Sequence, residues 1–179
     1  RQLAFALERK VFIHNRRGEL DRAIQAAGEA VDIYQAIGDV HNMAKGASLL
    51  GTSLAWQGRF PQALEWLSQS HAIANDIGDF HRSGYTGLVI GLVYTLMGCY
   101  PQAEVWVNKT LSLGDKLEFR RITAGAWMVR GWIALGRRDL MGALQALQEG
   151  VACYHLVNHR DELGWALATL GHVQIELGE

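Results

Sequence analysis

The stretch that decides the fold is residues 41–80, HNMAKGASLLGTSLAWQGRFPQALEWLSQSHAIANDIGDF. In its first half, apolar and small residues recur at steps of three and four, which is the spacing of one face of an α-helix. Gly58 then stands where a helix C-cap is expected, and Pro61 stands where the first turn of a helix tolerates proline. A second helical stripe runs to Gly78, and Asp79 is placed to cap the helix that follows. The stretch therefore predicts two helices joined by a short turn.

The same pattern returns along the chain every 40 residues, with no insertion or deletion. The repeating columns are Gly51, Gly91, Gly131 and Gly171; Ala23, Ala63, Ala103 and Ala143; Leu20, Phe60, Tyr100 and Leu140; Gly18, Gly58, Gly98 and Gly178, interrupted by Arg138; and Gly38 and Gly78, continued by Glu118 and Asn158. A period of this length indicates stacked supersecondary units. We expect an all-α solenoid of antiparallel hairpins with about nine helices. Its units are residues 1–40, 41–80, 81–120 and 121–160, followed by a half unit, 161–179.

The period also explains the glycine content. Glycine makes up 20 of 179 residues (about 11%, against a usual ~7%), while there are two prolines, so a loop-rich fold is not indicated. Gly51, Gly91 and Gly131 fall in the middle of helices, where we expect the facing helix to cross closely through the alanine column. On this interpretation Gly91→Leu overpacks the crossing and costs about 1–3 kcal/mol.

Composition and motifs exclude several classes of function. A net charge of −1 argues against a basic nucleic-acid footprint, and 49% apolar residues without a long apolar run argue against a membrane protein. The two cysteines fit a reducing compartment, so we expect a cytoplasmic protein. There is no nucleophile elbow, phosphate loop or paired-histidine zinc motif. We therefore predict a protein that is not an enzyme, with no catalytic residue, metal or cofactor.

The histidines are the only candidates for a metal site. His41 and His81 occupy one column, but that column continues as Arg121 and Asp161. His155 and His159 are four residues apart on either side of an expected turn. A structural zinc site needs four ligands. Neither pair has the further ligands, so we interpret these histidines as residues near helix ends.

The units resemble the tetratricopeptide repeat (TPR), whose signature combines a leucine–glycine pair, a turn glycine and a following aromatic and alanine. The residues that carry the resemblance are Ala47, Leu50, Gly51, Leu54, Gly58, Phe60, Ala63 and Leu67, with Gly87, Ile90, Gly91, Tyr94, Gly98, Tyr100, Ala103 and Val107 one unit later and Trp127, Arg130, Gly131, Ala134, Arg138, Leu140, Ala143 and Leu147 in the next. The resemblance implies a right-handed superhelix that binds partners. The 40-residue period and the Ile-Gly-Asp linkers are similar to those of the sensor arms of MalT-like bacterial regulators and of cyclase-linked or ATPase-linked signalling proteins. This implies signalling or transcription regulation.

The resemblance also places the first helix of each unit on a concave groove. The groove-binding residues that it implies are Tyr85, Leu88, Leu92, Met128, Trp132, Trp165 and His172. Arg130 stands where other units have leucine or isoleucine, so it either pairs with an acid or points into the groove. Such an apolar and aromatic groove suits an amphipathic helix or peptide of a partner protein.

Two other functions stay open. One is a small-molecule-sensing arm, in which a ligand stacks on Tyr85, Trp132 and Trp165. The other is self-association through uncovered ends, because the last helix carries Leu163, Leu167 and Leu170 with no helix after it. For the same reason we expect the chain to be a piece of a longer protein.

Overall fold

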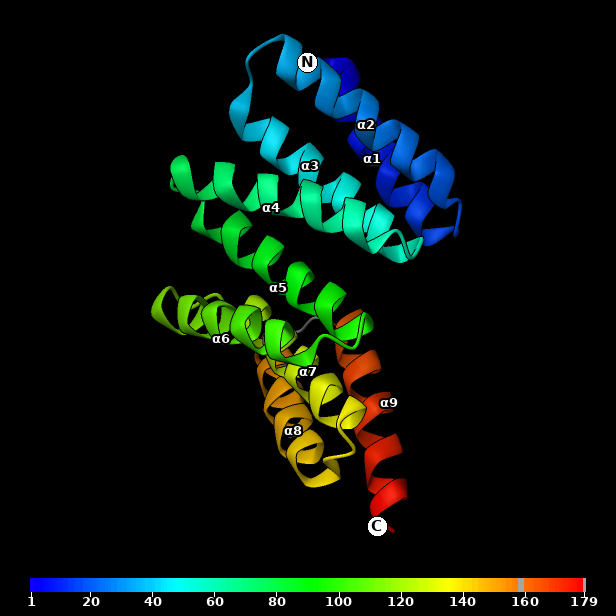
Figure 1. Cartoon of the computed structure of the whole chain (residues 1–179), viewed down its shortest axis with the longest axis vertical. Coiled ribbons are helices and arrows are strands. Elements are labelled where there is room, and N and C mark those ends of the chain that lie inside the picture. Colours follow the sequence, from blue (N-terminus) through cyan, green and yellow to red (C-terminus); the bar gives the residue numbers. More distant parts are fainter. Residues whose placement is uncertain (158–159, 179) are drawn as a thin grey trace. The chain divides into compact units, whose positions relative to one another are not determined.

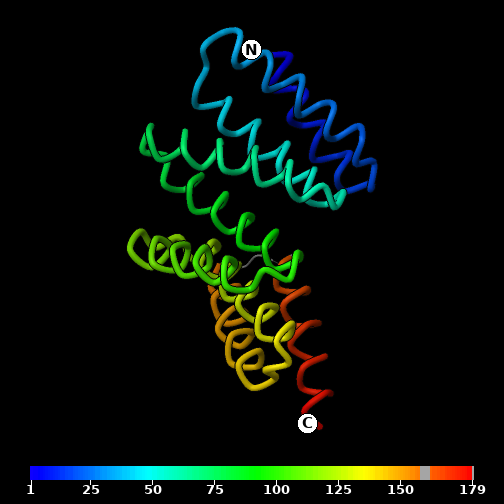
Figure 2. The backbone as a smooth tube through the Cα atoms, in the orientation of Figure 1, coloured from blue at the N-terminus to red at the C-terminus, as the bar shows by residue number. Residues whose placement is uncertain are grey.

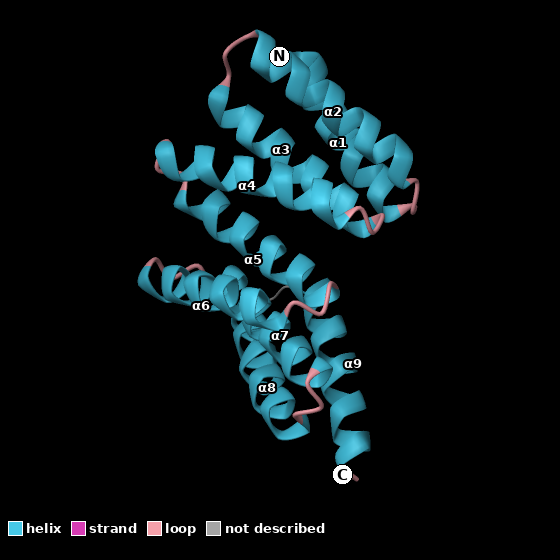
Figure 3. Cartoon of the chain, viewed as in Figure 1, coloured by secondary structure: helices cyan, strands magenta, loops and turns pink. Residues whose placement is uncertain are grey.

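The computed structural model describes the backbone of residues 1–157 and 160–178, and the side chains of all of these except 160 and 161. This part of the chain is helical apart from short turns (Figures 1 and 3). The helices are α1 (Gln2–Arg16), α2 (Leu20–Ala36), α3 (Val40–Trp56), α4 (Phe60–Asp76), α5 (Phe80–Leu96), α6 (Tyr100–Lys116), α7 (Arg120–Gly136), α8 (Leu140–Val157) and α9 (Arg160–Leu177). The expected all-α architecture of nine helices is thus confirmed over the described residues.

The helix starts keep the period of the sequence. From Leu20 onward each helix begins 20 residues after the one before it, through to Arg160. The tube in Figure 2 shows the result as long coils joined by narrow turns. Two consecutive helices therefore make one hairpin of 40 residues, with an odd-numbered helix first and an even-numbered helix second.

The turns share one backbone geometry, shown by the turn after α3. The amide of Gly58 donates to the carbonyl of Ala55 at 3.0 Å, and the amide of Arg59 donates to that of Leu54 at 2.9 Å. These two bonds form a Schellman motif, which needs a residue with positive φ after the helix. Gly58 supplies it with φ +79°, and it acts as a helix terminator as predicted.

Where the glycine columns are interrupted, other residues take the same conformation. Glu118 has φ +56° and Arg138 has φ +61°. The amide of Asp139 still donates to the carbonyl of Ala134 at 2.9 Å, as in the glycine turns. The hairpin geometry therefore prevails over the conformational preference of these two residues.

The aspartates that follow the linker glycines cap helices, as predicted. Asp39 accepts a bond from the Asn42 amide at 3.2 Å on Oδ1 and one from the Asn42 side chain at 2.9 Å on Oδ2. The side-chain bond from Asn42 is the main reason that the pKa of Asp39 lies below its usual value. Asp79 likewise accepts from the amide of Arg82 at 3.0 Å at the start of α5.

The chain divides into two compact units, residues 1–89 (unit 1) and residues 90–179 (unit 2). In unit 1, α1 packs on α2, α2 on α3 and α3 on α4 (Figure 1). The core there is built largely from small side chains. Its fully buried members include Ala4, Ala23, Ala30, Ala44, Ala63 and Leu67. Because alanine fills little volume, helices lined with it lie close together.

The mid-helix glycines lie at helix crossings, as expected, and two of the crossings are tight. A Cβ added to Gly51 would lie 2.7 Å from Cγ of Leu67 and 3.1 Å from the carbonyl oxygen of Ala63. A Cβ added to Gly131 would lie 2.7 Å from Cγ of Leu147. The nearest atoms thus belong to the leucine four residues after the alanine column.

The third crossing differs from this expectation. A Cβ added to Gly91 would first meet Cγ2 of Val107 at 3.4 Å, which is ordinary van der Waals contact. Valine is shorter than the leucine of the other two crossings, so it leaves room. At Gly171, on α9, an added Cβ has no neighbour within 4 Å.

In unit 2, α6 packs on α7, α7 on α8 and α8 on α9. One core cluster joins the last three helices: Ala124, Met128, Ala143, Leu147, Tyr154, Ala166 and Val173. Within the described ranges of both units, no helix combines the length and apolar character needed to cross a membrane.

Candidate binding surfaces

The residues predicted for the groove fall in both units, so each unit has its own candidate surface. In unit 2, Trp165 and His172 are exposed on α9, and 66% of Trp165 is accessible to solvent. Trp132 is half-buried because its indole packs against the core cluster of α7, α8 and α9. Leu92, near the end of α5, is also half-buried.

Met128 is placed differently from the prediction. Its side chain is 4% exposed and belongs to the core of unit 2. A Cβ added to Gly150 on α8 would lie 3.2 Å from the Met128 sulfur, so the glycine makes room for it. Met128 is therefore a packing residue, and its side chain is not available to a ligand at the surface.

Arg130 makes local contacts between α6 and α7. Its guanidinium carbon lies 4.8 Å from the centre of the Trp127 ring. Its Nη2 donates a hydrogen bond to Oδ1 of Asn108. The half-buried guanidinium of Arg130 thus contacts an indole and an amide. The sequence predicts instead that Arg130 either pairs with an acidic residue or points into the groove.

Unit 1 exposes aromatic side chains on its first helices. Phe5 and Phe12 on α1 are each 51% exposed to solvent, and Trp56 on α3 is 63% exposed. Tyr85 on α5 is 36% exposed, whereas Leu88 beside it is half-buried. Of the two residues predicted in this unit, Tyr85 is the more accessible to a partner.

A buried ion pair lies beneath the α1–α3 part of this surface. The Glu8 side chain is buried, and its Oε2 accepts from Nζ of Lys45 at 2.5 Å. Nζ of Lys45 is also 5.7 Å from the centre of the Phe5 ring, and the guanidinium of Arg9 is 5.1 Å from it. Both cations are therefore within cation–π range of the Phe5 ring. Oε1 of Glu8 is buried without a hydrogen-bond partner.

Tyr34 on α2 completes this cluster. Burial raises the pKa of Tyr34 to about 12, and the negative charge of Glu8 adds to the effect. Sequence reasoning did not find the Glu8–Lys45 pair, although a signal existed. Glu8 continues the buried stripe of Ala4 and Val11, and a buried carboxylate needs a cation nearby, which Lys45 supplies from α3.

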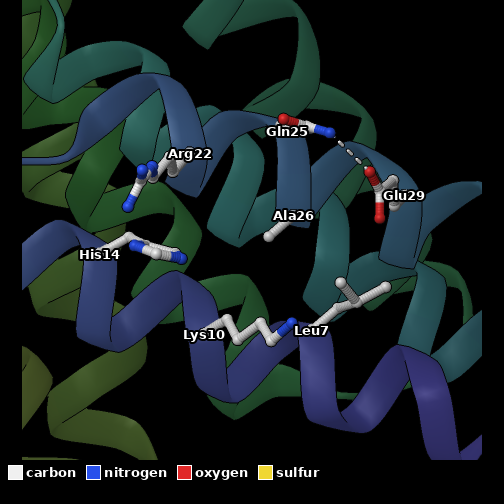
Figure 4. Close-up of a pocket in the computed structure, with 7 residues that line it drawn as sticks. All are labelled: Leu7, Lys10, His14, Arg22, Gln25, Ala26 and Glu29. Carbon is white, nitrogen blue, oxygen red and sulfur yellow. Dashed lines mark hydrogen bonds between the residues drawn. The ribbon is translucent and has the colours of Figure 1, made fainter.

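Two cavities open on unit 1. One, of about 270 Å³, is lined by Arg1, Gln2, Phe5, Tyr34 and Asn42. The other, of about 170 Å³, lies between α1 and α2 and is shown in Figure 4. Its lining residues are Leu7, Lys10, His14, Arg22, Gln25, Ala26 and Glu29. Several polar groups of the second cavity have partners: Gln25 donates to Glu29 at 2.9 Å, and His14 and Arg22 lie 2.5 and 3.4 Å from Glu19 at its edge.

Buried hydroxyl groups in unit 1 link three helices. Ser70 on α4 donates to the carbonyl oxygen of Ala44 at 2.7 Å and lies 3.4 Å from the hydroxyl of Thr86, which in turn lies 3.4 Å from that of Ser48. Nearby, the hydroxyl of buried Ser83 donates to Asn75 at 2.7 Å. These groups are engaged and shielded from solvent, so they act in packing.

The histidine columns serve helix ends as well. Nδ1 of His41 lies 3.7 Å from a carboxylate oxygen of Asp79, at the start of α5. Of the second histidine pair, His155 and His159, the second residue lies outside the part of the chain that the structure describes. Across residues 1–157 and 162–178, no cluster of three or more histidine, cysteine or acidic side chains is arranged to hold a metal ion.

No family model and no curated protein matches the sequence. Solved structures do match, and they agree on the architecture. A solved Rap protein in complex with competence and sporulation factor has a TM-score of 0.89 at 15% identity, over 98% of this chain and 49% of the Rap chain. The apo form of RapI has a TM-score of 0.75 at 16% identity, over 98% and 49% of the two chains.

A third match is to repeats that are themselves described as TPR-like. They belong to a putative kinesin light chain of Podospora anserina, with a TM-score of 0.60 at 14% identity, over 96% of this chain and 95% of that one. This chain has the TPR-like fold. At these identities the likeness shows the fold alone. The TPR-like chain spans about half the length of the two Rap proteins.

Proposed function

We propose that this TPR-like chain is a non-catalytic module that binds a protein or peptide segment on its first helices. The observation that carries the proposal is the exposure of large aromatic side chains on those helices: Phe5, Phe12, Trp56, Tyr85 and Trp165. Aromatic residues are enriched at protein interfaces, and exposed apolar patches mark interaction sites. A partner helix laid across α1 and α3 would cover the first three of these side chains.

The structural neighbours support this kind of function. The Rap protein with the highest TM-score among those described above was solved with competence and sporulation factor. A hairpin array with a similar fold therefore presents a surface to another molecule. The identity of that molecule does not carry over to this chain at 15% sequence identity.

A small-molecule-sensing arm is the second candidate, and the cavity beside Phe5 favours it. Phe5 and Tyr34 offer aromatic faces there, and Arg1, Gln2 and Asn42 offer polar groups. Its volume of about 270 Å³ is below the range of about 300–1,000 Å³ found for drug-sized ligands. A metabolite panel in thermal-shift assays tests this function. A rise in Tm that Phe5→Ala abolishes would support sensing.

The proposed function is tested by selecting from an unbiased library of displayed peptides. We expect enriched peptides to lose affinity for Trp56→Ala and Phe12→Ala, because each variant removes an exposed aromatic from a first helix. Val105→Ala and Met141→Ala are matched controls, since these residues are exposed apolar side chains on second helices. Val105 and Met141 variants should bind as the parent does.

Two outcomes of this selection would contradict the proposal. One is that no peptide is enriched over a scrambled background. The other is that the enriched peptides bind the first-helix variants and the second-helix variants equally. Circular dichroism melts show whether each variant is folded, so a loss of binding can be separated from a loss of structure.

We further propose that the module serves a larger cytoplasmic regulatory or signalling protein. The repeat length and the Ile-Gly-Asp linkers support this, as in MalT-like transcriptional regulators and signalling ATPases or cyclases. The complete gene tests the idea: an effector domain beside the TPR-like segment would support it, and a stand-alone repeat protein would contradict it.

Self-association is a separate proposal that rests on α9. Trp165, Leu167 and Ile175 are exposed there, with 66%, 46% and 74% of their surfaces accessible. Such a patch stabilises contact with another apolar surface, including that of a second copy.

A further inference from the structure

Charge is distributed unequally between the first and second helices of unit 1. The first helices, α1, α3 and α5 up to Val89, hold five Arg or Lys residues and one acidic residue, a net charge of 5 − 1 = +4. The second helices, α2 and α4, hold one Arg and five acidic residues, a net charge of 1 − 5 = −4. The chain's overall charge of −1 conceals this separation.

The single carboxylate of the first helices does not face solvent. Glu8 is 1% exposed and its charge is paired with Lys45. The side chains of Arg9 and Arg16 lie on the exposed side of α1. A ligand that approaches α1 from solvent therefore meets cations without a competing carboxylate from the same helix.

These cations share one stripe with the aromatic side chains. Phe5, Arg9, Phe12 and Arg16 follow one another at steps of four, three and four residues, which is one face of a helix. Lys45 on α3 continues the surface, because its Nζ lies 5.7 Å from the centre of the Phe5 ring. Trp56 follows eleven residues later on α3, about 20° further round the helix and so on the same face as Lys45. We call these six residues the cationic aromatic surface.

We propose that the cationic aromatic surface binds an acidic, amphipathic helical segment of a partner protein. The inference rests on the proposed function and names the chemistry of its partner. Apolar side chains of the segment pack on Phe5, Phe12 and Trp56, and its carboxylates pair with Arg9 and Arg16. Arg forms bidentate bonds with carboxylates and stacks on aromatic faces, as Arg9 does on Phe5.

A lipid bilayer with anionic headgroups fits this surface less well than a protein segment. A helix that lies on a membrane has its apolar face free to enter the lipid. In α1 that face is occupied, since Ala4, Leu7 and Val11 are buried in the core of unit 1. The exposed aromatic side chains are instead divided between two helices, which suits a segment lying across both.

The test uses three synthetic helical peptides of about 18 residues, a length at which a helix is stable enough to present one face. The first carries Glu on one face and Leu and Trp on the other; the second has Gln in place of each Glu, and the third has Lys. Fluorescence anisotropy with the whole chain measures affinity at low salt and at about 300 mM salt. We expect the Glu peptide to bind at least tenfold more tightly than the Gln peptide, and to weaken with salt.

Neighbouring residues of α1 provide a matched pair of variants. Arg9→Glu and Lys10→Glu make the same change of charge about 100° apart around the helix. Figure 4 shows Lys10 among the residues that line the cavity between α1 and α2. We expect Arg9→Glu to weaken the Glu peptide about tenfold and Lys10→Glu to leave it within about twofold.

The failure of this inference can be told apart from that of the proposed function. If Gln or Lys peptides bind as well as the Glu peptide and Trp56→Ala weakens them, the surface binds peptides but the acidic partner is wrong. If no peptide binds, including those from the unbiased library, the proposed function itself is wrong. Vesicles of phosphatidylglycerol that bind more tightly than the Glu peptide and displace it would also overturn the inference.

Discussion

At the scale of single residues, the glycines of one column have different physical roles. Gly51 and Gly131 each face a leucine side chain at a distance that excludes a Cβ, whereas Gly91 faces the shorter Val107. Gly171 faces open space. The sequence shows four equivalent glycines, but the residue across the helix crossing decides whether glycine is required.

Alanine substitutions separate these cases. Gly51→Ala and Gly131→Ala should each lower the free energy of unfolding by about 1–2 kcal/mol, since overpacking costs more than the ~1 kcal/mol that alanine gains in helix propensity. Gly91→Ala and Gly171→Ala should raise it by up to about 1 kcal/mol. Urea melts measure all four. Equal effects at Gly51 and Gly91 would contradict the difference in packing.

A second prediction concerns the left-handed residues Glu118 and Arg138. Holding a residue with a Cβ at positive φ costs about 1–2 kcal/mol, and glycine avoids that cost. Glu118→Gly and Arg138→Gly should therefore stabilise the chain by about 1 kcal/mol each, once the greater freedom of glycine in the unfolded chain is subtracted. Gly58→Ala is the control, and it should destabilise. Thermal melts that rank these variants in the opposite order would refute the interpretation.

At the scale of helices and hairpins, the sequence predicts the structure well because each 40-residue period of the sequence forms one helical hairpin. The same helix ends recur from hairpin to hairpin, so turn residues such as Gly58 and caps such as Asp39 repeat and can be recognised in the sequence. The exposure of a given column does not repeat in this way. Ser48, Leu88, Met128 and Ala168 share a column, yet Ser48 and Met128 are buried, Leu88 is half-buried and Ala168 is exposed.

Met128, predicted as a groove residue, is instead buried in the core of unit 2, for a definable reason. The resemblance assigns a column to the groove, but a glycine on the next helix, Gly150, created space into which the flexible Met128 side chain packs. For Arg130 the sequence leaves two alternatives, an acidic partner or the groove; the structure gives it Trp127 three residues earlier on α7 and Asn108 on α6, and only the second partner lies on another helix. A contact between two residues is hard to predict from the sequence when the pair does not recur with the 40-residue period.

The buried pair of α1 and α3 gives a prediction at this scale. Lys45→Met leaves the Glu8 carboxylate buried and unpaired, which should cost about 3 kcal/mol. Adding Glu8→Leu should recover most of that loss, because two apolar side chains replace the ion pair. Urea melts of the single and double variants measure the recovery. A double variant as unstable as Lys45→Met would show that the pair is not the cause.

Ionisation of Tyr34 in the same cluster makes the stability of the folded chain depend on pH in the alkaline range. Its pKa is raised from 10.0 to about 12 in the folded chain, because burial and Glu8 oppose ionisation. Its contribution to stability is complete below pH 10 and is lost as the pH rises from 10 towards 12. Tyr34→Phe should therefore lose less stability than the parent across this window. Melts at stepped pH measure the two slopes, and equal slopes would contradict the assignment.

At the scale of the whole molecule, the exposed apolar side chains of α9 predict concentration-dependent association. Leu167→Glu combined with Ile175→Glu should reduce association, because each change places a charge in the apolar patch. Sedimentation velocity over a range of concentrations measures it. Lys109→Glu provides a control for added charge on α6, outside this patch. A parent chain that remains monomeric at high concentration would exclude association through α9.

The constant spacing of the helix starts determines how the fold responds to inserted residues. One residue inserted within a helix rotates the side chains after it by about 100° and so turns part of its buried face towards solvent. The next turn restores the register, because its two backbone hydrogen bonds and its left-handed residue are set locally. The damage from such an insertion should therefore stay within one helix. Gain or loss of a complete 40-residue hairpin, by contrast, leaves every remaining turn in phase.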